Sequence, residues 1–212
     1  TATADLTKCD VVFYATPHGV AMADAAKLVA AGVKIIDLAA DFRFKDLAVF
    51  EKWYKLPHAC PDLAAEAAYG LVELNRDAIK KARIVGNPGC YATGAIALIR
   101  PLVDAGLLPA DFPVCLPSIS GYSGGGRTMI EAYEAGNAPA MELYALGLKH
   151  KHIPEIMRYT GLTRRPLFVP SVANFKQGML VQLPLHLDTL PGKPTAQDVE
   201  AALRSHYADS EW

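Results

Sequence analysis

The chain has little of what marks membrane-spanning or nucleic-acid-binding proteins. No apolar run approaches the length of a membrane span, and the first residues carry neither the basic nor the apolar region of a signal peptide. The formal net charge is only −1, and the Lys and Arg residues are scattered, so no basic patch favours nucleic acid or an anionic membrane. We therefore expect a cytoplasmic protein that binds neither nucleic acid nor a membrane.

Cysteine is also scarce, and its spacing excludes two kinds of site. The four cysteines show no paired spacing and no CxxC motif, which predicts free thiols in a reducing compartment and no structural zinc. His150 and His152 are two possible metal ligands, but the spacing suggests no third. We predict no metal site.

A glycine-rich dinucleotide fingerprint is absent as well. The first strand-to-helix turn is Thr16-Pro17-His18-Gly19, which is not GxGxxG. The segments around it nevertheless predict a βαβ unit, with strands at 10–15 and 33–38 and a helix at 22–31 that stops at Gly32. Because both strands are apolar on both faces, the pattern indicates a parallel sheet that is covered on each side.

The pattern changes in the second half of the chain. Strands are predicted at 114–118 and 167–170, and residues 179–187 alternate strictly, as in a half-buried antiparallel strand. Thr195 and Asp198 form a capping box for a last helix that runs to Tyr207. We expect an α/β part with a partial Rossmann-type parallel sheet, followed by an α+β part with a mixed or antiparallel sheet. The predicted domains are 1–89, a partial dinucleotide-binding domain, and 90–212, a catalytic, substrate-binding and oligomerisation domain.

Cys90 is the strongest candidate for a reacting group. A short strand at 82–85 leads into Asn87-Pro88-Gly89, and an apolar, Ala-rich helix follows to Gly106. A cysteine at a helix N-terminus is favoured as the thiolate, which is the nucleophilic form. The alternative is a small buried hydrophobic residue, and that interpretation suits Cys9, Cys60 and Cys115.

A proton partner for Cys90 is offered by the segment His150-Lys151-His152-Ile153-Pro154-Glu155. If the segment is helical, His152 and Glu155 share a face, and the carboxylate can orient the imidazole for acid/base chemistry. Pro154 makes this geometry uncertain because it disfavours the α conformation at Ile153. A solvated basic segment is the other interpretation.

Two further segments suit ligand binding. The loop 120–127 has four glycines and two serines, so its backbone can approach a phosphate or cofactor closely, unless it is only a flexible turn. Arg43 follows the second strand, where ligands bind in open α/β sheets, and its guanidinium suits a phosphate or carboxylate. A structural ion pair with Asp41 or Asp46 is the alternative.

Taken together, these motifs resemble the N-acetyl-γ-glutamyl-phosphate reductase family of arginine biosynthesis, which is related to aspartate-semialdehyde dehydrogenase. The resemblance covers nearly the whole chain and follows the family's order of motifs: Ala15–Gly19, Ile36–Arg43, Tyr69–Asn75, Gly86–Tyr91, Ser120–Gly124, His150–Glu155 and Gln177–Met179.

The resemblance implies an NADPH-dependent reduction of N-acetyl-γ-glutamyl phosphate to N-acetylglutamate semialdehyde through a thioester on Cys90. It implies that His152 is the acid/base and that Glu155 supports it, while the choice between His150 and His152 stays open. The implied substrate-binding residues are Arg43, Asn87, Ser120, Gly121 and His150. The implied NADP(H)-binding residues are Pro17, His18, Gly19, Ser123 and Gly124, and the implied assembly is a homotetramer.

The resemblance also implies a missing part. The family begins with a GxTGxxG-type unit and ends with a segment that completes the nucleotide-binding domain, so we expect this chain to be a fragment that binds NADPH poorly. Three other interpretations stay open: an aspartyl-phosphate reductase, a cysteine hydrolase that uses Cys90 and His152 without a nucleotide, and an inactive folding or assembly module.

Overall fold

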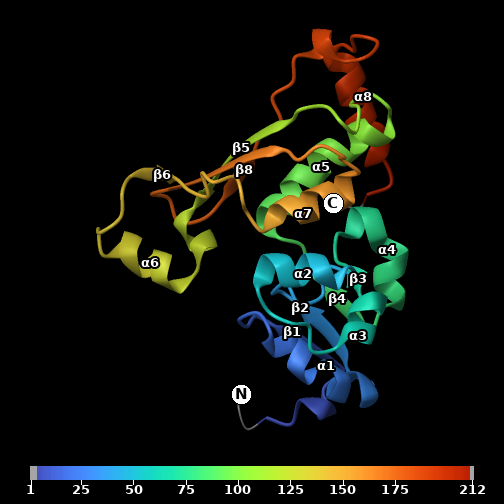
Figure 1. Cartoon of the computed structure of the whole chain (residues 1–212), viewed down its shortest axis with the longest axis vertical. Coiled ribbons are helices and arrows are strands. Elements are labelled where there is room, and N and C mark those ends of the chain that lie inside the picture. Colours follow the sequence, from blue (N-terminus) through green and yellow to red (C-terminus); the bar gives the residue numbers. More distant parts are fainter. Residues whose placement is uncertain (1–3, 211–212) are drawn as a thin grey trace. The chain divides into compact units, whose positions relative to one another are not determined.

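The chain forms two compact units, each with its own four-stranded sheet (Figure 1). The computed structural model describes residues 4–210. The two units divide between Gly89 and Cys90. The expected fold class is confirmed, since one sheet is parallel and the other is mixed.

The sheet of residues 1–89 is entirely parallel. Its strands are β1 (Val11–Tyr14), β2 (Lys34–Asp37), β3 (Ala68–Tyr69) and β4 (Ile84–Gly86), in the order β1-β2-β4-β3. The predicted βαβ unit is confirmed, because α1 (Val20–Ala30) connects β1 to β2, which pair in parallel from Val11↔Lys34 to Tyr14↔Asp37. Since all four strands run in one direction, the loops that follow them leave from one edge of the sheet.

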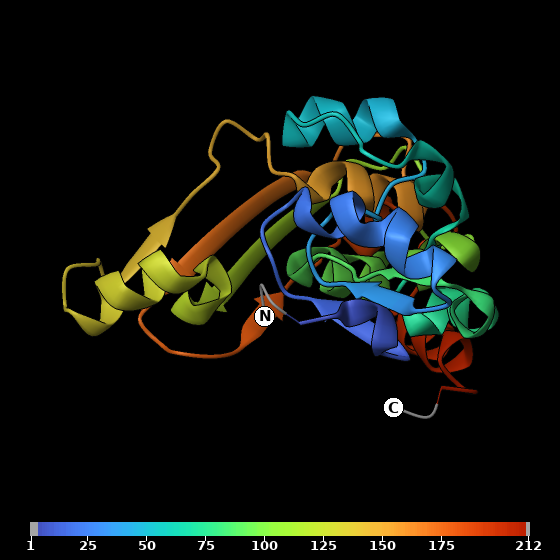
Figure 2. The same cartoon turned by 90° about the horizontal axis from the view of Figure 1, so that it is seen from below.

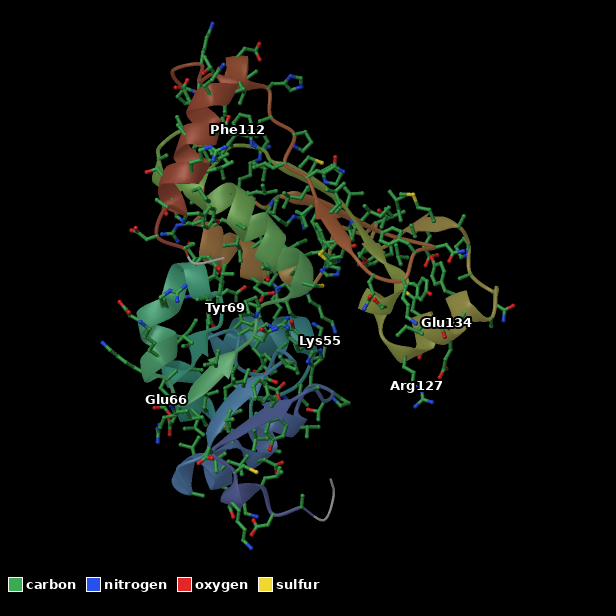
Figure 3. The ribbon with its side chains drawn as sticks, turned by 180° about the vertical axis from the view of Figure 1, so that it is seen from behind. Lys55, Glu66, Tyr69, Phe112, Arg127 and Glu134 are labelled. Carbon is green, nitrogen blue, oxygen red and sulfur yellow. The ribbon has the colours of Figure 1, made fainter. Side chains whose placement is uncertain are left out.

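Helices bury one face of β1, where Val12 and Tyr14 lie, and leave Val11 and Phe13 on the other face exposed. The expectation that the sheet is covered on each side is therefore wrong at this strand. After α1 come α2 (Leu47–Tyr54), α3 (Pro61–Glu66) and α4 (Val72–Lys81), and η1 (Leu6–Lys8) precedes β1. The core contains Ile35, Phe42 and Phe50, each at most 2% exposed. Figure 3 shows Glu66 at the end of α3 and Tyr69 on β3 in this unit. The sequence did not predict α3 or β3.

Three helices of residues 90–212 pack together. The longest, α5 (Cys90–Asp104), contacts α7 (His152–Thr160) and α8 (Ala196–His206). The buried residues of α5 include Ala92, Ala95, Ile96 and Ile99, which recur at the three- and four-residue spacing of one helix face. The predicted capping box of α8 is confirmed at Thr195 and Asp198. No helix within residues 4–210 has the length and apolar character needed to cross a membrane.

The second sheet is mixed. Its strands are β5 (Cys115–Gly121), β6 (Met141–Leu143), β7 (Leu167–Ala173) and β8 (Met179–Val181), in the order β6-β7-β5-β8. The central pair β5 and β7 is parallel, and both outer strands are antiparallel to their neighbours. In Figure 2, α6 (Arg127–Glu134) lies beyond the end of the long strand β5, after the short η2 (Tyr122–Gly125).

The long strand predicted at 179–187 is wrong in its extent. Only Met179–Val181 form a strand, and the last backbone bond to β5 runs from Gln182 N to Pro117 O at 3.2 Å. Pro184 has no N–H group to continue the ladder. The alternation of burial continues to Leu187, but residues 182–186 do not pair with a strand. A short 3-10 helix, η3 (Leu187–Thr189), follows them.

Candidate active site

Cys90 is the first residue of α5 and is exposed. The strand–turn–helix junction predicted around it is confirmed, since β4 ends at Gly86 and α5 begins four residues later. The backbone N–H groups of the first turn lack helical partners, so this position favours a negative sulfur. Cys60 shows the opposite environment, because burial, with the charge of Asp41, raises the pKa of that thiol to about 11.

His152 and Glu155 lie on the first turn of α7. The helix begins at His152, and Pro154 is accommodated because a first turn needs no donor at that position. Residues three apart on a helix share a face, so His152 and Glu155 leave α7 on the same side. Glu155 is fully buried, which places its carboxylate in the protein interior beside Tyr159, whose pKa rises to about 12 chiefly through burial and then through Glu155.

His150 is held as a neutral imidazole. The backbone N–H of His152 donates to His150 Nδ1 at 3.1 Å, and the two rings meet edge to face at 4.6 Å. Burial, with a smaller effect of Lys151, lowers the pKa of His150 from 6.5 to about 4. The ring also packs edge to face on Phe168 at 5.0 Å, so this segment is not a freely solvated basic stretch.

Two tyrosines near the cysteine were not predicted from the sequence. Tyr91 donates from its hydroxyl to Ser171 O at 2.8 Å, and its ring lies 6.4 Å from that of His152. Burial raises the pKa of Tyr144, and the charges of Tyr91 and Cys90 raise it further. Tyr144 lies beside the histidines of this unit, since its ring centroid is 6.0 Å from that of His150. Tyr91 is adjacent to Cys90 in sequence, whereas no sequence signal marks Tyr144.

The predicted glycine-rich loop begins at the end of β5. Ser120 is buried, and its hydroxyl interacts with Tyr91. A Cβ on Gly124 would lie 3.5 Å from Ser120 Oγ, so this part of the loop folds back over the serine. Gly121 is required by packing, because a Cβ there would lie 2.6 Å from Phe175 O. Ser123 donates from its backbone N–H to Lys176 O at 3.2 Å.

In residues 1–89, the turn Pro17–Gly19 is held by a buried carboxylate. Asp41 Oδ1 and Oδ2 accept the Gly19 N–H at 2.9 and 3.0 Å, and Oδ2 also accepts the Met22 N–H at 3.1 Å. Gly19 has φ +96° at the N-terminus of α1, a backbone conformation that suits glycine. The ring of His18 meets Tyr54 edge to face at 4.8 Å.

Arg43 lies in the loop after β2 and donates to two backbone carbonyls. Its Nε donates to Asn87 O at 2.7 Å and its Nη2 to Leu38 O at 3.4 Å. Asp46 caps α2, with Ala48 N at 3.0 Å from its carboxylate, and Asp41 caps α1 as described. Asn87 Nδ2 donates to Pro88 O at 3.2 Å.

The predicted residues thus fall into two groups. Residues 90–212 contain one set of candidates: Cys90, Ser120, Gly121, Ser123, Gly124, His150, His152 and Glu155. The structure adds Tyr91 and Tyr144 to this set. Residues 1–89 contain the other set: Pro17, His18, Gly19, Arg43 and Asn87. Within residues 4–210, no cluster of three His, Cys, Asp or Glu side chains is arranged to hold a metal ion.

Known families match both units. Residues 90–212 match the semialdehyde dehydrogenase dimerisation domain, and residues 1–82 match the semialdehyde dehydrogenase NAD binding domain. The expected resemblance is confirmed by curated relatives named N-acetyl-gamma-glutamyl-phosphate reductase. The protein of Janthinobacterium sp. (strain Marseille) is 53% identical over 184 residues, or 83% of this chain and 52% of that protein. The protein of Bordetella pertussis is 45% identical over 217 residues, or 97% of this chain and 59% of that protein.

Solved structures show the same fold at low sequence identity. Aspartate semialdehyde dehydrogenase II from Vibrio cholerae has a TM-score of 0.64 at 15% identity, covering 96% of this chain and 62% of that one. The Candida albicans enzyme, solved with NADP, has a TM-score of 0.55 at 16% identity, covering 93% of this chain and 56% of that one. The chain spans about half the length of the curated relatives it matches. Because one family match alone covers more than half of its residues, the chain belongs to the semialdehyde dehydrogenase family.

Proposed function

We propose that this protein carries the thioester chemistry of an NADP-dependent acyl-phosphate reductase acting on N-acetyl-γ-glutamyl phosphate. The observation that carries the proposal is the placement of Cys90 at the start of α5, in a unit that also holds His152 and Glu155 on the first turn of α7. The names of the curated relatives support this substrate.

In the proposed reaction, His152 accepts the proton of the Cys90 thiol, and the sulfur attacks the carbonyl carbon of the acyl phosphate. A carbon–sulfur bond forms, the bond from carbon to the phosphate oxygen breaks, and phosphate leaves. A bound nicotinamide cofactor supplies the hydride that reduces the acyl group to the aldehyde. When the carbon–sulfur bond breaks, His152 returns the proton to Cys90 Sγ. Glu155 orients His152. We prefer His152 to His150 because burial lowers the pKa of His150 to about 4, which makes it a weak proton acceptor.

The other predicted residues have binding roles in this proposal. Arg43 and Asn87 bind the phosphate of the substrate, and its acyl group is bound by Ser120, Gly121 and His150. For the cofactor, Ser123 and Gly124 serve the nicotinamide end, where the glycines of the loop allow a close approach of the backbone. Pro17, His18 and Gly19 line the middle of the cofactor. The N-terminus of α1 does not fit a phosphate, because Asp41 already accepts its N–H groups.

Self-association is part of the proposal. The match of residues 90–212 to a dimerisation domain supports a homo-oligomer, and we propose a tetramer. The mixed sheet exposes apolar side chains suited to such an interface, among them Met141, Leu143, Leu167 and Leu180.

The test is the acylation half-reaction, which requires no nucleotide. The chain is mixed with N-acetyl-γ-glutamyl phosphate or with aspartyl phosphate, and the acylated peptide is identified by mass spectrometry. We expect an N-acetylglutamyl thioester on Cys90, which is absent in Cys90→Ala and unchanged in Cys9→Ala, since Cys9 is the other exposed thiol. His152→Asn should slow acylation by about 10²–10⁴-fold, the usual contribution of a general acid/base.

Other outcomes assign other functions. Faster acylation by aspartyl phosphate would identify the sister substrate class. Rapid hydrolysis of the adduct without any nucleotide would identify a cysteine hydrolase. Absence of an adduct in the folded chain would support an inactive assembly module.

A further inference from the structure

The turn that leads into Cys90 is fixed at Asn87 through both of its backbone groups. The Asn87 N–H donates to Asp37 O, at the end of β2, at 2.8 Å. The Asn87 carbonyl accepts from Arg43 Nε at 2.7 Å. Both partners come from β2 and the loop that follows it, so this loop determines where the chain leaves β4.

Arg43 is built into the protein interior. Only 8% of its surface is exposed, and its Nη2 donates to Leu38 O at 3.4 Å. One guanidinium therefore joins the first residue after β2 to the turn after β4. A hydrogen bond from a charged donor to a carbonyl is shorter and stronger than a neutral one, which agrees with the 2.7 Å distance.

The backbones of the two loops also touch. A Cβ on Gly86 would collide with Phe42 O and would lie 3.0 Å from Arg43 N. The end of β4 therefore carries glycine because the Phe42–Arg43 backbone passes directly over it. This close approach places the backbone of Arg43 next to Gly86, the residue that precedes Asn87.

We propose that Arg43 is a positioning residue for Cys90, in addition to any contact it makes with substrate. By holding the Asn87 carbonyl, Arg43 fixes the turn Asn87-Pro88-Gly89, whose next residue is the first residue of α5. The proposal rests on the proposed role of Cys90 as the nucleophile. Lysine cannot replace this function, because a single ammonium on a flexible stem does not reproduce two nitrogen donors held in one plane.

The experiment measures alkylation of Cys90 by iodoacetamide as a function of pH, in the full chain and without substrate or phosphate. The variants are Arg43→Lys, which keeps the charge, and Arg43→Gln, which keeps one donor group. Arg83→Lys is the matched control, since Arg83 makes an exposed ion pair with Glu66. Circular dichroism and thermal melting establish that each variant folds.

We expect both Arg43 variants to alkylate at Cys90 at least roughly tenfold more slowly, with a displaced pH profile, because a misplacement of about 1 Å can cost ~10²-fold in rate. Arg83→Lys should match the wild type. If Arg43 serves only to bind the substrate phosphate, alkylation is unchanged and only the KM for the acyl phosphate rises, which overturns the proposal. Full rescue by Arg43→Lys overturns it as well, since the effect would then be one of charge alone.

Two results separate this inference from the proposed function. If Cys90 of the wild type is no more reactive than Cys9, the proposed nucleophile is wrong whatever Arg43 does. If Cys90 is selectively reactive and the Arg43 variants leave its profile unchanged, only the inference about Arg43 fails. Loss of the folded state in both Arg43 variants would assign Arg43 to the stability of residues 1–89 and would also overturn the proposal.

Discussion

Two buried tyrosines of residues 90–212 differ in the hydrogen bonding of their hydroxyl groups. Tyr91 donates to Ser171 O, whereas Tyr133 Oη is buried without a hydrogen-bond partner among residues 4–210. The Tyr133 ring stacks on Tyr122 at 5.0 Å, so its aromatic contact does not depend on the hydroxyl. A buried polar group that lacks a partner destabilises the fold, while a satisfied one stabilises it modestly.

The same substitution should therefore have different effects at these two positions. Tyr91→Phe is expected to lower the free energy of unfolding by about 1–2 kcal/mol, because it leaves the buried Ser171 carbonyl without its donor. Tyr133→Phe should leave that free energy unchanged or raise it. Urea denaturation of both variants checks the pair, and a large loss of stability in Tyr133→Phe would show that its hydroxyl has a partner.

The lowered pKa of His150 predicts how the free energy of unfolding depends on pH. Its pKa falls from 6.5 to about 4 in the fold, so the unfolded chain binds the proton more readily between these values. The contribution of His150 to stability is complete above pH 6.5 and decreases as the pH falls towards 4. The charged and titratable groups around it are Lys151, His152 and Tyr144.

The His150→Asn variant isolates this dependence. Asparagine retains an acceptor for the His152 N–H but does not titrate, so the variant should lose less stability than the wild type between pH 6.5 and 4. Denaturation midpoints across this range give the comparison. Parallel curves for the two proteins would contradict the neutral state assigned to His150.

At the scale of the element, α1 depends on a cap supplied from a distant loop. Its N-cap residue is Gly19, which has no side chain, and the carboxylate of Asp41 accepts from Gly19 and Met22 instead. By contrast, α2 is capped by Asp46, which immediately precedes the helix. The two caps differ in burial, since Asp41 is fully buried and Asp46 is exposed.

Removing each cap should show this difference. We expect Asp41→Ala to lower the free energy of unfolding by about 2 kcal/mol or more, and Asp46→Ala by about 0.5–1 kcal/mol. The larger effect arises because the Met22 N–H lies in the interior, where water cannot replace the carboxylate. Equal losses, measured by urea denaturation, would mean that water reaches the start of α1.

The elements predicted correctly are those with a local cause. The strand pair around α1 and the Thr195 capping box follow from apolar runs and cap residues within a few positions. The strand predicted at 179–187 failed because alternation does not show whether a neighbouring strand continues. The short β3 and β6 were missed, since strands of two or three residues form through pairing with their neighbours.

The candidate site divides in the same way. Cys90, His152 and Glu155 were predictable because each lies in a short motif near a helix start. Tyr144 was not, because it directly follows β6, whose place depends on antiparallel pairing with β7. The backbone role of Arg43 was also hidden, since its partner Asn87 is 44 residues away in the chain.

At the scale of the whole molecule, the parallel sheet has an open edge at β1 among residues 4–210. Phe13 on this strand is 61% exposed, and Val11 on the same face is 40% exposed. An exposed apolar edge strand is a site of association between chains. We therefore expect the chain to associate in a concentration-dependent manner through β1.

Phe13→Lys tests this expectation. The charge should reduce association through β1, as measured by sedimentation velocity over a range of concentrations. Val72→Lys is the control, since Val72 is similarly apolar and 39% exposed but lies on α4. An equal reduction in both variants would show that net charge, rather than the edge of the sheet, governs association.

The carboxylate at the start of α1 has a consequence for competition with free anions. Asp41 belongs to the same chain as the two N–H groups that donate to it. Its effective concentration at the start of α1 therefore exceeds that of free phosphate in solution. An anion could enter only by displacing a buried, tethered group that already makes three hydrogen bonds. The start of α1 is thus occupied by a carboxylate of the protein itself, and the turn at Gly19 can contact a ligand without binding its charge.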